Sequence, residues 1–188
     1  MIKSYKIESI ILARRNFGEA DKFVTVFSKQ TGKKTVIAKG VRRIKSRRAP
    51  HIELFSHTVL ILHPGKTFDL ITEAVCLENF SLARQKIERI GFIYIALELT
   101  QRLTAELVPT PVIFDQLLRF LNTLNHPATR RPDALRELNL YKEFMLSELG
   151  FLHPARSVSG TQLDMAIEEV LESTLKSTPF LTRIQSLV

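Results

Sequence analysis

Along the first 80 residues of the chain, hydrophobic positions alternate with polar ones, a spacing that puts every second side chain on one face of an extended strand. This alternation, with its β-branched runs and intervening turn residues, predicts five strands. The expected ranges are 5–13, 22–28, 33–39, 52–63 and 67–77. Five strands in so short a segment indicate a small closed barrel, and the OB-fold is the common five-stranded arrangement.

After residue 80 the hydrophobic residues recur at every third and fourth position, which is typical of amphipathic helices. Thr110 and Pro111 suit the start of one helix, and Gly150 suits the end of another. The predicted helices cover residues 84–106, 111–124, 132–149 and 163–172, with a loop at 153–161. We therefore expect an α+β chain of two domains: an OB-fold nucleic-acid-binding domain at 1–80 and an all-α helical domain at 81–188.

The net charge of +8 comes entirely from the first of these regions. Residues 1–80 contain 15 Lys and Arg and 7 Asp and Glu, whereas residues 81–188 contain 12 of each kind. Such an uneven distribution makes nucleic acid or an anionic surface the leading partner class for the N-terminal domain.

The densest positive segment is 39–48, KGVRRIKSRR, which has six basic residues and no acidic one. Six like charges repel one another unless they are solvated or neutralised, and Gly40 and Ser46 leave the backbone flexible enough to follow a phosphate chain. Basic residues at the end of the first strand and on the third could extend the same field. The predicted phosphate-binding residues are Arg14, Arg15, Lys33, Lys34, Lys39, Arg42, Arg43, Lys45, Arg47 and Arg48. A solvated loop without a partner is the alternative.

Aromatic side chains are candidates for stacking on bases, because every base offers a flat face to a ring. Phe23 and Phe27 alternate with Val24 and Val26 on the second predicted strand, so one pair faces the core and the other is a candidate. Further candidates are Phe17, Phe55 and Phe68. For each of them, burial in the core is the alternative.

Catalytic and metal-binding motifs are missing from the sequence. Gly65-Lys66-Thr67 resembles the end of a phosphate-binding loop, but Leu60 stands where that motif requires glycine. His51, His57 and His63 recur every six residues and would share a strand face, but that spacing separates neighbours by roughly 20 Å and prevents them from sharing one metal ion. Cys76 is the only cysteine, so disulfide scaffolds and four-cysteine zinc modules are excluded. We expect neither an enzyme nor a cofactor.

The sequence also predicts a cytoplasmic protein. The longest apolar stretch in a predicted helix, 90–97, has eight residues, whereas a bilayer span needs roughly 20. The N-terminal segment has no small-residue cleavage site and continues as a strand rather than as a removable leader.

The spacing of small and charged residues in the N-terminal half resembles that of the RecO family of bacterial recombination mediators. The matching positions are Gly18-Glu19-x-Asp21, Phe27, Gly32-Lys33, Ala38-Lys39-Gly40, Arg42-Arg43, Ser46-Arg47 and Leu54-Phe55. In the second half, Glu148-Leu149-Gly150-Phe151 with Pro154 is compatible with the family. Many members carry a four-cysteine zinc element just after this point; here residues 153–161 replace it, so no zinc is expected.

The resemblance implies a non-enzymatic protein that binds single- and double-stranded DNA through its OB-fold and anneals complementary strands. It would act with RecR to help load RecA onto strands covered by single-stranded-DNA-binding protein, and it would be cytoplasmic and nucleoid-associated. Two strands bound on one basic surface lose their mutual repulsion and can pair without nucleotide hydrolysis. In the helical domain, an apolar groove edged by arginines would suit an acidic, aromatic-tipped tail, with Arg89, Arg102 and Arg119 as the candidate partner-binding residues.

Two other functions remain open at this point. One is a general single-stranded RNA-binding OB-fold protein, because electrostatics does not distinguish the two polymers; only a site that reads the 2′-hydroxyl does. The other is a protein-interaction adapter whose basic loop is incidental.

Overall fold

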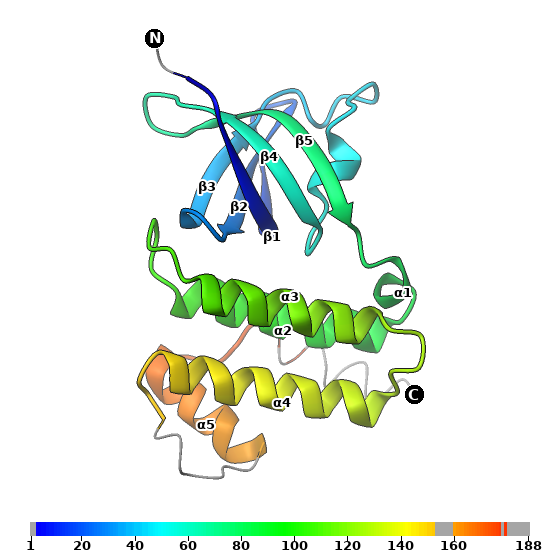
Figure 1. Ribbon diagram of the computed structural model, residues 1–188, viewed down its shortest axis with the longest axis vertical. Helices are drawn as coiled ribbons and strands as arrows, with labels where there is room; N and C mark the ends of the chain where they lie inside the picture. Colours follow the sequence, from blue (N-terminus) through cyan, green and yellow to red (C-terminus); the bar gives the residue numbers. More distant parts are fainter. Residues whose placement is uncertain (1–2, 153–159, 178, 180–188) are drawn as a thin grey trace. The chain divides into compact units, whose positions relative to one another are not determined.

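The computed structural model describes residues 3–152, 160–177 and 179, and the chain divides into two compact units (Figure 1). The barrel unit consists of Met1–Asn79 together with Thr104–Phe114. The helical unit consists of Phe80–Leu103 and Asp115–Val188. The barrel unit thus takes in a second stretch of chain beyond residue 80.

Five strands close into a barrel in the order β1-β2-β3-β5-β4, which confirms the predicted OB-fold. All neighbouring strands are antiparallel except β3 and β5, which run parallel and meet at Ile37 and Leu70. The strands are β1 Tyr5–Phe17, β2 Asp21–Ser28, β3 Gly32–Ala38, β4 His57–His63 and β5 Leu70–Glu78.

The first half of the predicted fourth strand is wrong. Ala49–Ile52 form a short 3-10 helix, η1, whose first turn accommodates Pro50 because the missing N–H is not needed there. Phe55 then adopts a φ of 50°, which no strand residue has, and β4 begins only at His57. The phenyl ring of Phe55 is fully buried, so packing selects this conformation against the local alternation.

The barrel core follows from the alternation along β2 and β3. Val24 and Val26 on β2 pair with Val36 and Lys34 on β3, and the valines point inward and are fully buried. Burying one such side chain contributes about 1.5–3 kcal/mol. The core is completed by Ile7, Ile11, Ala38, Val41, Ile52, Leu60, Leu62 and Ile71.

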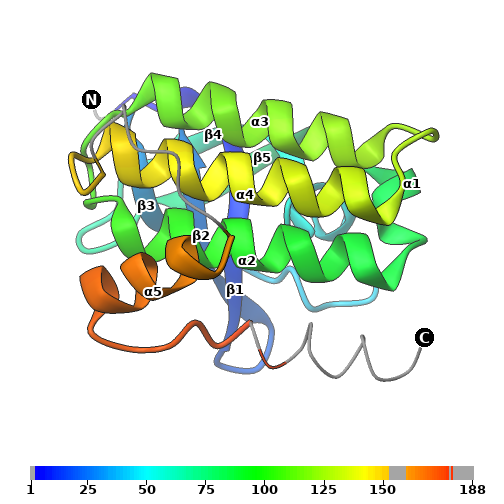
Figure 2. The ribbon, with the colours of Figure 1, turned by 90° about the horizontal axis from the view of Figure 1, so that it is seen from below.

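The helices are α1 Ser81–Arg84, α2 Ile87–Leu103, α3 Pro111–Asn125, α4 Arg131–Glu148 and α5 Gly160–Leu171. The helix predicted at 84–106 is shorter than expected at both ends: α2 begins at Ile87 and ends at Leu103, and Arg84 belongs to the separate short helix α1. Within the helical unit α4 packs against α2 and α5 (Figure 2). The buried hydroxyls of Thr100 and Tyr141 lie 2.7 Å apart between α2 and α4. None of the helices formed by the described residues is long and apolar enough to cross a membrane.

One predicted helix end and one predicted first residue are confirmed, whereas one predicted N-cap is wrong. Gly150 ends α4 with a φ of 80°, and Phe151 N–H donates to the Leu146 carbonyl at 2.8 Å. Pro111 is the first residue of α3, but the Thr110 hydroxyl makes no hydrogen bond to any described residue and is not a cap. The predicted loop at 153–161 lies mostly outside the described residues, and Gly160 already belongs to α5.

The stretch between α2 and α3 lies along the turn that joins β2 and β3. Leu107 N–H donates to the Lys33 carbonyl at 2.9 Å, and Glu106 forms a parallel bridge with Lys33. Gly32 has a φ of 71°, and a Cβ built on it would lie 2.1 Å from the Val108 carbonyl oxygen. Only glycine therefore fits at this point of the turn.

Candidate nucleic-acid interface

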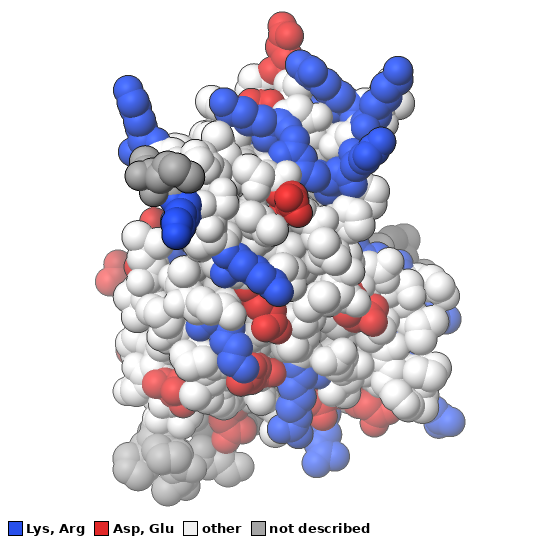
Figure 3. All heavy atoms as spheres, turned by 45° about the horizontal axis from the view of Figure 1, so that its top comes forward, with Lys and Arg blue, Asp and Glu red and all other residues white. Residues whose placement is uncertain are grey.

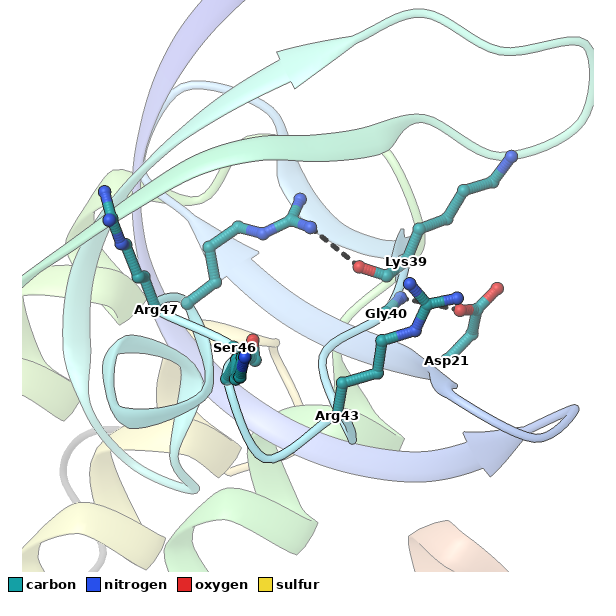
Figure 4. Close-up of a pocket in the computed structure, with 8 residues that line it drawn as sticks. Asp21, Lys39, Gly40, Arg43, Ser46 and Arg47 are labelled. Atoms are coloured by element: carbon teal, nitrogen blue, oxygen red, sulfur yellow. Dashed lines mark hydrogen bonds between the residues drawn. The ribbon is translucent and has the colours of Figure 1, made fainter.

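The basic segment 39–48 forms the loop between β3 and η1, and its backbone is fixed at several points (Figure 4). Gly40, in a left-handed conformation with a φ of 66°, donates its N–H to an Asp21 carboxylate oxygen at 2.7 Å. Arg42 N–H donates to the Ala20 carbonyl at 2.9 Å. At the other end, the Arg48 guanidinium donates to the carbonyls of Lys39, at 2.7 Å, and Ile71. The loop is thus held in one shape by contacts that use few of its own charges.

This loop surrounds an open hollow of about 500 Å³, which we name the basic hollow. Its lining residues are Asp21, Lys39, Gly40, Arg43, Lys45, Ser46, Arg47 and Arg48. Asp21 is the one acidic residue among them, and one of its oxygens is already used by Gly40. The field inside the hollow is therefore strongly positive.

Four of the lining cations have no partner among the described residues. The side chains of Lys39, Arg43, Lys45 and Arg47 are exposed and make no hydrogen bond or ion pair with any residue that the structure describes. In Figure 4 the side chains of Lys39 and Arg47 extend away from the loop backbone, whereas that of Arg43 lies over Gly40. On the face shown in Figure 3, Lys and Arg side chains gather over the barrel. We call these four residues the loop cations.

The other predicted phosphate-binding residues are engaged within the barrel unit to different extents. Arg14 makes a two-pronged ion pair with Glu53, with N–O distances of 2.5 and 2.7 Å. Arg42 donates to the Gly18 carbonyl at 3.0 Å. Lys33 donates to the Thr104 carbonyl at 2.5 Å.

Lys34 takes part in the most enclosed of these arrangements. Its ammonium group donates to the Asp69 carboxylate and to the Tyr5 hydroxyl, at 2.8 Å for the latter, and Tyr5 donates to the same carboxylate. Burial alone would raise the pKa of Asp69, but hydrogen bonds from Lys34, Tyr5 and the Gly65 N–H, with the Lys34 charge, hold that pKa below its ordinary value. The Lys34 charge is thus matched inside the protein.

The aromatic side chains predicted to stack on bases also differ, in how far they are buried. Phe27 and Phe55 are fully buried and belong to the core, and the Phe27 ring lies against Phe114. Phe17 is 46% exposed, and its ring neighbours that of Phe23, over which the Arg15 guanidinium lies at 5.2 Å from the centroid.

The three arginines predicted to bind a partner differ in their surroundings. Arg89 is buried and donates to the carbonyls of Leu124, His126 and Thr129, at 2.8, 3.1 and 2.5 Å. Arg102 donates to the Glu98 carboxylate and to the Thr174 carbonyl, whereas Arg119 is exposed.

Sequence reasoning missed a second basic surface around one of these arginines. Arg89 lines a hollow of about 220 Å³ together with Lys86, Arg130 and Arg131, with Phe92 and Ala134 as apolar members, and with Glu88, which pairs with Arg131 at 3.5 Å, as its one acidic member. Lys86 precedes α2 and Arg89 lies in its first turn, whereas Arg130 caps α4 and Arg131 is its first residue, so the cluster is visible only once those two helix starts are brought together.

The histidines of the barrel unit have separate partners. His51 Nδ1 accepts the Cys76 N–H at 3.2 Å, His57 lies 2.8 Å from a Glu8 oxygen, and His63 contacts Ser4. Among the described residues, no group of three or more His, Cys, Asp or Glu side chains could hold a metal ion.

A closed five-stranded barrel with a cationic loop at its surface is an OB-fold domain, a class in which loops and strand faces bind oligonucleotides. Residues 1–80 match the family model described as "Recombination protein O N terminal". The chain belongs to the RecO family.

Curated relatives support the same assignment. The chain is 38% identical over 147 residues to the "DNA repair protein RecO" of Roseiflexus sp. (strain RS-1), covering 78% of this chain and 50% of that protein. It is 32% identical over 123 residues to the protein of that name from Pelotomaculum thermopropionicum, covering 65% and 48%. For Symbiobacterium thermophilum the identity is 31% over 147 residues, covering 78% and 57%. The chain spans about half the length of the curated relatives it matches.

Proposed function

We propose that the chain is a non-enzymatic recombination mediator in DNA repair, which binds single- and double-stranded DNA through the loop cations and anneals complementary strands. The observation that carries this proposal is the basic hollow, where four cations of the OB barrel have no partner among the described residues. Each phosphate bound there would release condensed counterions, which is the main source of affinity for nucleic acids. The relatives' name, DNA repair protein, supports DNA as the polymer.

Annealing follows from the same charges. Two complementary strands repel each other through their phosphates, and a surface that neutralises several phosphates on each lowers that repulsion. No bond is made or broken, so the step needs neither a nucleotide nor a catalytic group. In the cell this activity would be joined to RecR and to single-stranded-DNA-binding protein, and it would help RecA onto the covered strand.

The helical unit is our proposed site for the acidic tail of a partner. Arg119 is exposed, and the hollow beside Arg89 presents Lys86 and Arg130 next to apolar side chains, whereas Arg131 in the same hollow is paired with Glu88 at 3.5 Å. Arginine pairs with carboxylates in a two-pronged geometry, which suits an acidic peptide with a C-terminal carboxylate.

Fluorescence anisotropy with a labelled single strand, measured across a salt series, tests the binding step. Four phosphate contacts predict a slope of log K against log salt of about −2.8, at roughly 0.7 per contact. Absence of binding at low salt would overturn the proposal. Competition with RNA separates the polymers: displacement of DNA by clearly lower concentrations of RNA would favour an RNA-binding OB-fold protein instead.

A strand-annealing assay tests the second step. Complementary oligonucleotides carrying a fluorophore and a quencher are mixed with and without the chain, first bare and then coated with single-stranded-DNA-binding protein. The proposal predicts faster quenching in both cases. Acceleration with bare strands only would confine the chain to annealing and remove the partner step.

A further inference from the structure

We propose that Phe17, Phe23 and Phe68 form a stacking platform for unpaired bases, beside the loop that binds the phosphates of the same strand. This inference rests on the proposed DNA binding and adds which part of the DNA the barrel contacts. We call these three residues the aromatic platform.

The three rings form one continuous cluster although they come from different elements. Phe17 ends β1, Phe23 lies on β2 and Phe68 lies in the connection between β4 and β5. The ring centroids of Phe17 and Phe23 are 4.4 Å apart and those of Phe23 and Phe68 are 5.0 Å apart. Phe17 is 46% exposed and the other two are partly exposed, whereas the neighbouring Phe27 and Phe55 are fully buried. The barrel thus leaves aromatic surface in water that its core does not use.

Charge next to the rings identifies the occupant as a polyanion. The Arg15 guanidinium lies over the Phe23 ring, with its carbon 5.2 Å from the centroid, and its donors are available at the exposed edge of the cluster. A guanidinium in this position both stacks on planar groups and pairs with phosphate. A purely apolar partner would gain nothing from it. Two acidic residues lie close to Phe17 in sequence, Glu19 and Asp21. Asp21 is bonded to Gly40 of the loop, and Glu19 is exposed.

The platform and the basic hollow share one structural support. Phe17 pairs with Asp21 across the β1–β2 turn, and Asp21 accepts the Gly40 N–H that positions the loop. In the same turn, the Gly18 and Ala20 carbonyls accept hydrogen bonds from Arg42. A single strand held by the loop cations therefore passes directly beside the rings. Bases of a duplex are stacked inside the helix, so only an unpaired strand can use the platform.

The chain contains no tryptophan, which allows a direct test. Phe17→Trp introduces a single indole, whose fluorescence is titrated with a single-stranded oligonucleotide and with an abasic strand of equal length. We expect strong quenching by the oligonucleotide and little by the abasic strand. Phe151→Trp, at a 53% exposed position in the helical unit, serves as the control and should respond to neither. Equal quenching of the Phe17→Trp variant by both strands would overturn the platform.

A leucine variant distinguishes failure of the aromatic platform from failure of the proposed DNA binding. Phe17→Leu retains an apolar side chain but removes the ring, so we expect about a tenfold loss of affinity for the single strand and no change for the abasic strand or the duplex. An equal loss on all three ligands, or no loss on any, would overturn the platform, whereas binding of DNA by the unmodified chain would still support the proposed function. If the unmodified chain binds neither the oligonucleotide nor the abasic strand at low salt, the proposed DNA binding itself fails.

Discussion

Strand β3 carries two basic residues and the loop that follows it carries six, and most of the loop's cations differ from those of the strand in how they are used. On β3, Lys33 donates to the Thr104 carbonyl and Lys34 is bonded to Asp69 and Tyr5. In the loop, the side chains of Lys39, Arg43, Lys45 and Arg47 have no partner within the described part of the chain. Net charge alone is therefore a poor guide to phosphate binding, because a cation that is already paired inside the protein contributes little to binding a phosphate.

The two lysines of β3 also differ from each other in the direction of their pKa shifts. Burial lowers the pKa of Lys33, and the Glu106 charge only partly offsets this effect. Burial also lowers the pKa of Lys34, but hydrogen bonds to Asp69 and Tyr5, with their charges, outweigh it and raise that pKa above its ordinary value. Lys34 is thus a structural cation, whereas the loop cations depend on solvent or ligand.

The largest expected effect comes from removing the loop cations together. Changing Lys39, Arg43, Lys45 and Arg47 to Gln should weaken single-strand binding by about two to three orders of magnitude near 0.1 M salt and flatten the salt slope by about 2.8. Anisotropy titrations measure both quantities. The matched control changes four exposed cations of the helical unit, Lys86, Arg119, Arg136 and Lys176. A control that loses as much affinity as the loop variant would break the comparison.

A change in the turn that supports Lys33 should act on stability instead. Gly32→Ala combines a left-handed backbone with a Cβ that would lie 2.1 Å from the Val108 carbonyl oxygen. We expect a loss of roughly 2–4 kcal/mol in the free energy of unfolding, measured with urea. Gly18→Ala is the matched control, because its φ is 55° but no atom lies within 4 Å of the added Cβ. It should cost about 1–2 kcal/mol from backbone strain alone. Similar losses in both variants would contradict the close packing at Gly32.

Acidification should remove the stabilising contribution of Asp69, the partner of Lys34 in the barrel unit. The pKa of Asp69 is lowered in the folded chain, so its stabilising contribution is present above the ordinary value of 3.8 and is lost as the pH falls through the lowered folded value. Asp69→Asn should therefore reduce stability by about 1–2 kcal/mol at pH 7 and weaken its dependence on pH below about 4. Urea unfolding from pH 7 to pH 2.5 measures this. An unchanged pH profile in the variant would show that Asp69 is not linked to folding.

The smallest effect is expected at Arg48, which lines the hollow but bonds to the barrel. Arg48→Lys keeps the charge and gives up the two-carbonyl contact with Lys39 and Ile71. We expect a stability loss of about 1 kcal/mol and less than about a threefold change in DNA affinity, because the phosphate-facing charges stay in place. A large loss of affinity with unchanged stability would move Arg48 into the group of loop cations.

The sequence predicted most of the barrel, because alternation is a local property. β2 and β3 lie within one residue of their expected ranges, and the basic segment 39–48 lies in a loop as its composition indicated. The error at the start of β4 arose because η1 and the left-handed Phe55 depend on packing that no spacing records. The same is true of charge pairing: Asp69 and Tyr5, the partners of Lys34, lie 35 and 29 residues away.

Likewise, the helix predicted at 84–106 was too long because 104–106 leave it to bond with Lys33. Arg89 is predicted to bind a partner at the edge of an apolar groove, and nothing near it in sequence shows that three carbonyls between Leu124 and Thr129 surround its guanidinium.

The stretch Thr104–Phe114 has a practical consequence for dissecting the molecule. A fragment that stops at Asn79 would lose the carbonyl that receives the Lys33 ammonium and the ring that covers Phe27. It would then present an uncovered aromatic side chain and a newly released cation on the same strand pair, and nonspecific adhesion of that fragment to DNA or to other proteins could pass for native activity. Work on the isolated barrel therefore calls for a graft of 104–114 rather than a simple cut.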